Sequence, residues 1–319
     1  MHQQKHRACS CFLPVFLSLI FIIVCLFSTV WLRHGSVPLP AQFTPYSPAP
    51  AFSNIQDGSF PEVLNSRYAL LLRLSDGQVL MSKHSGEKAY PASLTKIMTV
   101  LVALENLPGK EKPCTLPDGI FPPLYDEGAS MAGFLPGETV RTKDLLYGAL
   151  LPSGADAAVA LAYEVSGSEA SFVEKMNQKA QELGMYDTHF ENATGLHQDG
   201  HVTTADDLSL LLQYALKNTD FRNIFTSSRY SVPPTNLHPG GFTFSSTLSA
   251  SLEGVAIPDG QILGGKTGYT PEAGLCLASL AEIGGTEYLL ITMGAPGNHQ
   301  TEAYHITDAV SVYQQLSGG

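Results

Sequence analysis

From Ser93 to Glu105 the chain reads SLTKIMTVLVALE, and the period of this stretch decides the fold. Its apolar residues recur at the spacing that places them on one face of a helix. That face consists of Leu94, Ile97, Met98, Leu101 and Leu104. Pro108 and Gly109 end the pattern, as is usual just beyond the C-terminus of a helix. The stretch therefore predicts an amphipathic helix with a single apolar stripe.

β-prone segments flank this helix toward both ends of the chain. Before it, runs at 68–74 and 79–82 surround an Asp76-Gly77 turn and predict two strands. After it, helical patterns occur at 142–151, 155–165, 168–183 and 204–216, the last with Thr203 or Thr204 as its cap. Past residue 226 come short β-prone runs at 229–232, 242–244, 262–266, 275–281 and 288–293, and then an amphipathic helix at 301–316. This order predicts an α+β fold, with an antiparallel sheet built from both chain ends, packed with helices and joined to an all-helical insertion.

The N-terminal region has the composition of a membrane anchor followed by a spacer. No charged residue lies between Cys9 and Leu32, and about 20 apolar residues suffice for a helix to cross a bilayer. Lys5 and Arg7 precede this run, which by the positive-inside rule places the N-terminus in the cytoplasm. We predict a cytoplasmic segment at 1–11, a transmembrane signal anchor at 12–32, a Pro-rich linker at 33–62 and an extracytoplasmic domain at 63–319. Cleavage further downstream, near Ala41, is the alternative.

The charge of the chain excludes one class of partner. With 18 Lys and Arg against 29 Asp and Glu, the net charge is −11. Lys5, Arg7 and Arg33 are the only charged residues before position 35, so everything after Arg33 carries −14. We expect no nucleic-acid partner, because phosphate binding needs a basic surface that the acidic body lacks.

The cysteine and histidine patterns favour neither a disulfide framework nor a metal centre. Cys114 and Cys276 are the only cysteines beyond the N-terminal region. A protein not built on disulfides is favoured, and a single bridge between these two is left open. His197 and His201 lie in a segment without a His-Glu-x-x-His or comparable ligand set. We therefore predict no metal and no cofactor, and expect the segment around His201 to support a site formed by other residues.

Three short motifs occur in order along the predicted domain. They are Ser93-Leu94-Thr95-Lys96, Ser153-Gly154-Ala155 and Lys266-Thr267-Gly268. Positions i and i+3 of a helix share one face, so Ser93 and Lys96 lie one turn apart, where an unprotonated lysine could take the serine proton. Such a lysine must be desolvated or placed near another cation. Lys266 could supply that second charge and also attract a substrate carboxylate.

Two backbone N–H groups complete the chemistry that these side chains suggest. At the start of a helix, the N–H of Ser93 lies at the positive end of the dipole, where an oxyanion is stabilised. Gly268 lets another backbone come close to its strand, and the N–H of Tyr269 is then a second donor. Together these groups form a constellation for acyl transfer that needs neither His nor Asp.

With these motifs the sequence resembles the active-site-serine penicillin-binding proteins, specifically the low-molecular-mass D-alanyl-D-alanine carboxypeptidases. The resemblance covers roughly residues 63–316 and includes the contexts PASLTKIMT at 91–99, LLPSG at 150–154, FENATGL at 190–196, HVTTADDL at 201–208 and GGKTGYT at 264–270. It implies the β-lactamase and penicillin-binding-protein fold. It also implies a serine hydrolase that removes the terminal D-Ala from peptidoglycan stem pentapeptides.

The resemblance also implies a role for each motif residue. Ser93 is the acylated nucleophile, Lys96 the general base and Ser153 a proton relay to the leaving amine. The substrate-binding residues are Lys266, Thr267, Gly268 and Tyr269. β-Lactams would be covalent inhibitors, because they mimic the terminal dipeptide and trap Ser93. The predicted anchor at 12–32 places this chemistry on the outer side of the cell membrane.

The second motif departs from the family pattern. The family has Ser-x-Asn, and position 155 here is Ala, so an amide that helps to hold the substrate carbonyl is missing. Loss of one such positioning group costs on the order of 10²-fold in rate. Two alternatives therefore stay open beside the carboxypeptidase: a poorly active penicillin- or peptidoglycan-binding protein that is still acylated, and a related serine hydrolase acting on another amide or ester.

Overall fold

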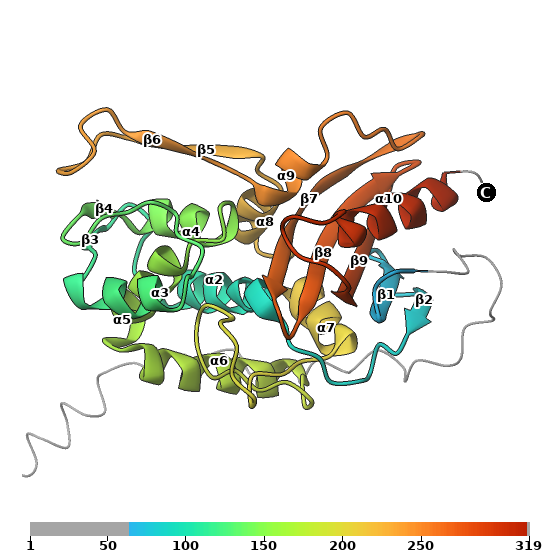
Figure 1. Cartoon of the computed structure of the whole chain (residues 1–319), viewed down its shortest axis with the longest axis horizontal. Coiled ribbons are helices and arrows are strands. Elements are labelled where there is room, and N and C mark those ends of the chain that lie inside the picture. The colour runs from blue at the N-terminus through green and yellow to red at the C-terminus, as the bar shows by residue number, and fades with distance from the viewer. Residues whose placement is uncertain (1–63, 318–319) are drawn as a thin grey trace, which may run out of the picture. The chain divides into compact units, whose positions relative to one another are not determined.

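The computed structural model describes residues 64–317, which are coloured in Figure 1. The segments predicted at 1–11, 12–32 and 33–62 lie outside the described residues, as do the outer limits of the domain predicted at 63–319. Between residues 64 and 317, no helix has both the length and the apolar character that a membrane crossing requires.

A five-stranded antiparallel sheet unites the two ends of the described chain (Figure 1). Its strands are β1 (Tyr68–Arg73), β2 (Val79–Lys83), β7 (Gly260–Thr270), β8 (Gly274–Ile283) and β9 (Thr286–Ala295). They are ordered β2-β1-β9-β8-β7, and β1 pairs with β9 so that Leu71 lies opposite Leu290. The predicted α+β fold, with one sheet built from both chain ends, is confirmed.

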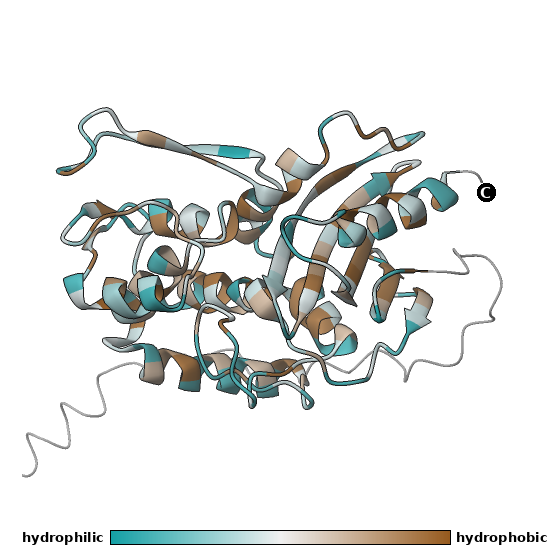
Figure 2. Ribbon diagram, viewed as in Figure 1, coloured by the Kyte–Doolittle hydropathy of each residue, from teal (hydrophilic) through white to brown (hydrophobic). Residues whose placement is uncertain are grey.

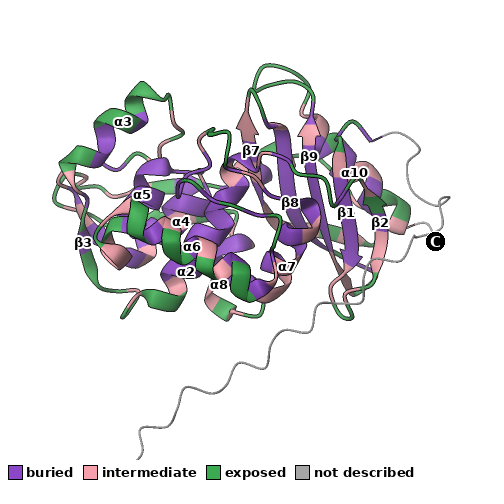
Figure 3. Ribbon diagram, turned by 90° about the horizontal axis from the view of Figure 1, so that it is seen from below, coloured by how far each residue is buried: buried purple, intermediate pink, exposed green. Residues whose placement is uncertain are grey.

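Both faces of this sheet are covered, because alternate residues of a strand point to opposite sides. Ala69 and Leu71 of β1 belong to the same buried cluster as Val312 of the C-terminal helix α10 (Tyr304–Leu316). Leu70 and Leu72 belong instead to the larger cluster on the helical side. Figure 2 shows apolar residues along the central strands, and Figure 3 shows that these strands are buried.

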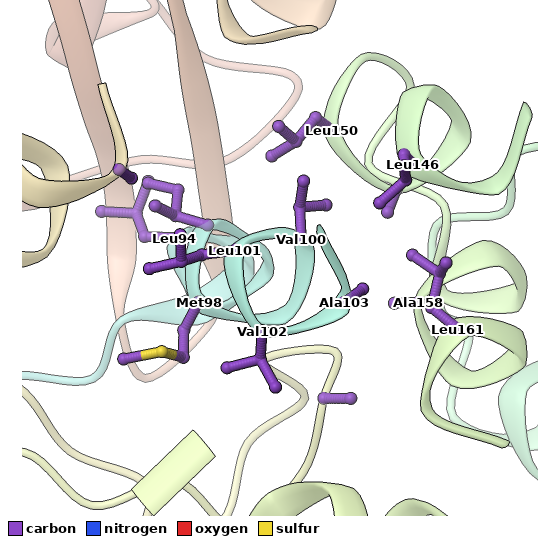
Figure 4. Packing of buried hydrophobic residues seen from close by; sticks show 14 of the residues in the cluster. Leu94, Met98, Val100, Leu101, Val102, Ala103, Leu146, Leu150, Ala158 and Leu161 are labelled. Carbon is purple, nitrogen blue, oxygen red and sulfur yellow. The ribbon is translucent and has the colours of Figure 1, made fainter. Parts of the chain in front are cut away.

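The helical part of the domain is built around α2 (Thr95–Asn106). Every residue of this helix from Thr95 to Ala103 is buried. Figure 4 shows Ala103 pointing toward Ala158 of a neighbouring helix, while Val100 and Val102 point to opposite sides of α2. The amphipathic stripe predicted from the sequence is therefore part of a wider apolar surface. A helix that is apolar all round is typical of a core position. The surrounding helices are α4 (Thr142–Leu150), α5 (Ala155–Ser166), α6 (Glu169–Leu183) and α7 (Ala205–Ala215).

The prediction of an all-helical insertion needs correction, because short strands occur within it. β3 (Pro113–Thr115) pairs with β4 (Thr139–Arg141). β5 (Arg229–Val232) pairs with β6 (Phe242–Ser245), which confirms the β-prone runs predicted at 229–232 and 242–244. Three short helices were also not predicted: α3 (Phe121–Asp126), α8 (Thr219–Phe225) and α9 (Thr247–Ser251). Helices of five to seven residues are too short to show a clear helical period.

Two finer predictions have clear outcomes. Thr204, one of the two predicted caps, accepts a hydrogen bond from the N–H of Asp207 at the start of α7. Cys114 and Cys276 are both buried with free thiols, so the single bridge left open by the sequence is not formed. Burial raises the pKa of each thiol to about 12.

Candidate active site

Ser93 lies in a tight turn that leads directly into α2. The 3-10 turn η1 (Ala92–Leu94) begins with Ala92 at a φ of 47°, a conformation that non-glycine residues rarely adopt. The loop containing Gly195 presses against this turn, since a Cβ on Gly195 would lie 1.8 Å from the carbonyl oxygen of Ala92. Ser93 itself is half-buried while its neighbours on both sides are buried, so its hydroxyl is presented at the edge of the core.

The side chain of Lys96 contacts the hydroxyl of Ser93. Its Nζ lies 3.0 Å from Ser93 Oγ and donates to the carbonyl oxygen of Thr194 at 2.6 Å. Burial lowers the pKa of Lys96 to about 7, although the negative charge of Asp156 acts in the opposite direction. Near neutral pH a large fraction of Lys96 is therefore unprotonated, with a lone pair available to the serine proton.

The carbonyl of Thr194 is held by the side chain of Asn192. Asn192 Oδ1 accepts hydrogen bonds from the N–H groups of Thr194 and Gly195, and its Nδ2 donates to the carbonyl of Leu196. An Asn that closes a turn on its own backbone in this way fixes the loop without outside help. The segment FENATGL thus supplies the second hydrogen-bond partner of Lys96.

A second serine and lysine form a pair on the other side of the site. Lys266 Nζ donates to Ser153 Oγ at 2.9 Å and to the carbonyl of Thr267 at 2.6 Å. Ser153 has a φ of 64° and lies in the short connection between α4 and α5. Burial holds the pKa of Lys266 well below its usual range, and the charge of Lys96 lowers it further. The expected effect of Lys266 on Lys96 is not seen, because the pKa of Lys96 is lowered by burial and opposed by Asp156, whereas the charge of Lys96 acts on Lys266.

The strand β7 brings the third motif against the turn of Ser93. A Cβ on Gly268 would lie 3.1 Å from the backbone nitrogen of Ser93, so the absence of a side chain there allows the close approach. Thr267 and Tyr269 flank this contact and are half-buried. The ring of Tyr269 meets that of His299 edge-on, with 4.9 Å between centroids. All seven predicted site residues thus converge on one region between β7, η1 and the start of α5.

Asp156 is an important residue that the sequence analysis missed. Its carboxylate accepts hydrogen bonds from the backbone N–H groups of Ala132, Gly133 and Phe134. This fixes the loop 130–134 against the second motif, where the N–H of Ala155 also donates to the carbonyl of Ser130. Burial raises the pKa of Asp156. The available signal was an acidic residue directly after Ser153-Gly154-Ala155, in a helix whose other early residues are apolar.

His201 forms hydrogen bonds that link the first turn of α2 to the segment around Glu191. Its Nδ1 accepts from the N–H of Glu191, so its Nε2–H donates to Thr95 Oγ1 at 2.7 Å. Burial lowers the pKa of His201 to about 3, which keeps the ring neutral. Thr95 stands between Ser93 and Lys96, so this contact helps to fix the first turn of α2. Among residues 64–317, no group of three or more His, Cys, Asp or Glu is arranged to hold a metal ion.

Known proteins are similar to this chain in both sequence and fold. The chain is 36% identical to the D-alanyl-D-alanine carboxypeptidase DacF of Bacillus subtilis, over 77% of this chain and 62% of that protein. It is 33% identical to a D-alanyl-D-alanine carboxypeptidase of Streptomyces strain K15, over 66% of this chain and 74% of that protein. The chain thus spans about three fifths of the length of the Bacillus relative.

Two solved structures have a fold similar to that of this chain. The Streptomyces K15 DD-transpeptidase superposes with a TM-score of 0.71 at 27% identity, covering 81% of this chain and 98% of that one. The D-alanyl-D-alanine carboxypeptidase of Mycobacterium tuberculosis superposes with a TM-score of 0.72 at 26% identity, covering 84% and 97%. Residues 56–297 match the family described as D-alanyl-D-alanine carboxypeptidase. This chain therefore belongs to the D-alanyl-D-alanine carboxypeptidase family.

Proposed function

We propose that this protein is a serine D,D-carboxypeptidase that removes the terminal D-Ala from peptidoglycan stem pentapeptides. The observation that carries the proposal is the pair Ser93 and Lys96. The 3.0 Å separation of Oγ and Nζ, together with a pKa of Lys96 of about 7, suits a nucleophile and its general base. Membership of the family supports the substrate class.

In the acylation step, neutral Lys96 takes the hydroxyl proton of Ser93 while Ser93 Oγ bonds to the carbonyl carbon of the penultimate D-Ala. The carbonyl oxygen becomes an oxyanion, which the N–H groups of Ser93 and Tyr269 stabilise. The close approach of Gly268 to the nitrogen of Ser93 supports this pairing of donors. No metal ion is needed, because the developing charge meets fixed backbone dipoles.

When the tetrahedral intermediate collapses, the bond to the terminal D-Ala breaks and its nitrogen takes a proton. Ser153 passes its hydroxyl proton to the leaving amine and is reprotonated by Lys96, which holds the proton taken from Ser93. Ser153 Oγ lies 2.9 Å from Lys266 Nζ, which positions it. The carboxylate of the leaving D-Ala rests against Lys266 and Thr267. Its negative charge raises the pKa of Lys266, because an opposite charge favours the ammonium form. Water then hydrolyses the ester and restores Ser93.

Ala155 favours a second candidate function. The side chain at 155 is buried and apolar, so the amide of the family motif has no counterpart at this position. In this second candidate, Ser93 is acylated by stem peptides and β-lactams, but turnover is slow and the protein acts chiefly by binding. Replacing Ala155 by Asn should then raise the rate of D-Ala release, whereas an unchanged rate would show that the site works without the amide.

The proposal extends to the partners and the location. Peptidoglycan stem peptides are the substrates, and β-lactams are covalent inhibitors that acylate Ser93. The apolar run at 12–32, followed by the Pro-rich run at 33–62, supports a single membrane anchor with the domain beginning near residue 63 on the extracytoplasmic side.

The test uses the full-length protein, purified in mild detergent, and a stem pentapeptide. Release of D-Ala is measured for the wild type and for Ser93→Ala, and both are labelled with a fluorescent penicillin. The proposal predicts D-Ala release and labelling by the wild type and neither by Ser93→Ala. Labelling without release would favour the second candidate. Absence of both signals would contradict a D,D-peptidase function and direct attention to other amides and esters.

A further inference from the structure

Thr247 connects the second and third motifs, although it belongs to neither. It is the first residue of α9, and its N–H donates to the carbonyl of Leu151 at 3.1 Å. Leu151 lies two residues before Ser153. The hydroxyl of Thr247 lies 2.7 Å from the hydroxyl of Thr267, which directly follows Lys266. One residue therefore touches the approach to Ser153 and the residue after Lys266.

Packing fixes Thr247 in this position. Its neighbour Leu248 is buried with 1% exposure and lies directly over β7. A Cβ added to Gly265 would come within 2.7 Å of Leu248 Cδ2, so α9 approaches the strand as closely as a glycine allows. Ser246 caps the helix by accepting from the N–H of Ser249. The hydrogen bond to Leu151, the packing of Leu248 and the cap formed by Ser246 thus fix the backbone of Thr247. Its hydroxyl therefore stays next to that of Thr267.

The two hydroxyls together can point a proton at an anion. Each hydroxyl has one hydrogen to donate and two lone pairs that can accept. If Thr247 donates to Thr267, the hydrogen of Thr267 is free for a third group. A carboxylate can only accept, so its arrival beside Thr267 selects this direction. A chain of hydroxyls polarised in one direction also strengthens each of its hydrogen bonds.

We infer that Thr247 is a positioning residue, which donates its hydroxyl proton to Thr267 and thereby aims the Thr267 hydroxyl at the terminal carboxylate of the substrate. The inference rests on the proposed function, because it needs a substrate that ends in a free carboxylate. Thr247 acts only through Thr267. Its loss should therefore weaken recognition of the carboxylate and leave the chemistry at Ser93 intact.

The test compares Thr247→Val, which keeps the shape and removes the hydroxyl, with Thr247→Ser, which restores it. One hydrogen bond of this kind contributes about 0.5–1.5 kcal/mol, so Thr247→Val should raise KM for a D-Ala-D-Ala peptide about three- to tenfold with kcat unchanged. Thr247→Ser should return KM to the wild-type value. The same peptide with its C-terminal carboxylate amidated, measured by competition with fluorescent penicillin, should bind the wild type and Thr247→Val equally.

The matched control is Thr115→Val. Thr115 and Thr139 form an exposed hydroxyl pair of 2.8 Å between β3 and β4, so this variant removes a similar contact outside the site and should leave KM unchanged. Three results would overturn the inference: an unchanged KM in Thr247→Val, an equal loss of affinity for acid and amide, or no rescue by Thr247→Ser. Wild type and Ser93→Ala are assayed alongside, because absence of D-Ala release in the wild type would refute the proposed function itself.

Discussion

A lysine in water is almost fully protonated at neutral pH, and an ammonium group cannot accept the proton of a serine. Lys96 escapes this limit because burial disfavours its charged form, which brings its pKa to about 7. The negative charge of Asp156 acts in the opposite direction, since it favours the ammonium form. A pKa near the working pH is the most effective value for a general base.

This pKa predicts the pH dependence of acylation. Below pH 7 Lys96 holds its proton and no base is present, so the rate of labelling by penicillin should rise with pH and level off above about 8. Lys96→Arg places a permanently charged group at this position, and should lower the rate by about 10²-fold or more at every pH. Labelling is measured between pH 5.5 and 8.5. A flat profile for the wild type would show that Lys96 is not the base.

The sequence predicted the side chains of the site and two backbone N–H donors, but not the carbonyl partner of Lys96. Ser93, Lys96, Ser153 and Lys266 stand in recognisable motifs, and the structure brings them within hydrogen-bond distance in pairs. The carbonyl of Thr194 could not be predicted, because every residue has a carbonyl and only the loop geometry selects this one. Thr247 was missed for a similar reason, since it lies 20 residues before Thr267 and no short motif links them.

At the scale of elements, the loop 190–196 acts as a support for the catalytic turn. Asn192 closes the loop on itself, and Gly195 lets it press against the carbonyl of Ala92. The same loop presents the Thr194 carbonyl to Lys96. Its conformation therefore sets both the position of the nucleophilic turn and the environment of the base.

Two glycine variants separate backbone strain from contact. Gly195 and Gly184 have similar φ values, +82° and +80°, but a Cβ at 195 meets Ala92 and a Cβ at 184 meets nothing within 4 Å. Alanine at either site costs about 1–2 kcal/mol in a left-handed conformation. Only Gly195→Ala should also displace the catalytic turn, and a shift of about 1 Å there costs roughly 10²-fold in rate.

The measurement combines chemical unfolding with penicillin labelling for both variants. Gly184→Ala should lose stability but be labelled at the wild-type rate. Gly195→Ala should lose more stability and label far more slowly. Equal labelling rates in the two variants would mean that the contact between the loop and the turn does not matter for the reaction.

Long helices were predictable, whereas short elements were not. The helices α4, α5, α6 and α7 end within two residues of their predicted limits, because each has several turns with a clear apolar period. The 3-residue strands β3 and β4 gave no such signal. The helix α3 contains Pro122 and Pro123 in its first turn, where proline is tolerated but is easily mistaken for a loop.

At the scale of the whole domain, the two ends of the described chain hold each other in place. Asp308 of α10 accepts hydrogen bonds from the backbone N–H groups of Asn65 and Ser66 and from Asn65 Nδ2. Lys83 of β2 donates to the carbonyls of Leu64 and Ser66. These hydrogen bonds attach the segment before β1 to the C-terminal helix and to β2, the edge strand of the sheet that also contains β7.

Loss of the hydrogen bonds to Asp308 should lower the stability of the domain without changing the rate at which Ser93 is acylated. Asp308→Asn keeps one acceptor oxygen but replaces the other by an NH2 group, so at least one of the three hydrogen bonds is lost and the rest lose their charged acceptor. A hydrogen bond to a charged group contributes about 1.5–3 kcal/mol, so we expect the free energy of unfolding to fall by about 2–4 kcal/mol. Penicillin labelling of the folded protein should be unaffected. The control is Glu253→Gln, an exposed carboxylate, which should change neither quantity. If the free energy of unfolding of Asp308→Asn equals that of the wild type, the hydrogen bonds to Asp308 do not stabilise the domain.

If D-Ala is released through an ester on Ser93, that ester should be detectable on the protein during turnover. Full-length protein is mixed with a stem pentapeptide, quenched with acid during turnover, digested and examined by mass spectrometry. We expect the peptide that contains Ser93 to carry the added mass of the stem peptide shortened by its terminal D-Ala. An acyl group on any other residue, or D-Ala release from Ser93→Ala at the wild-type rate, would contradict it.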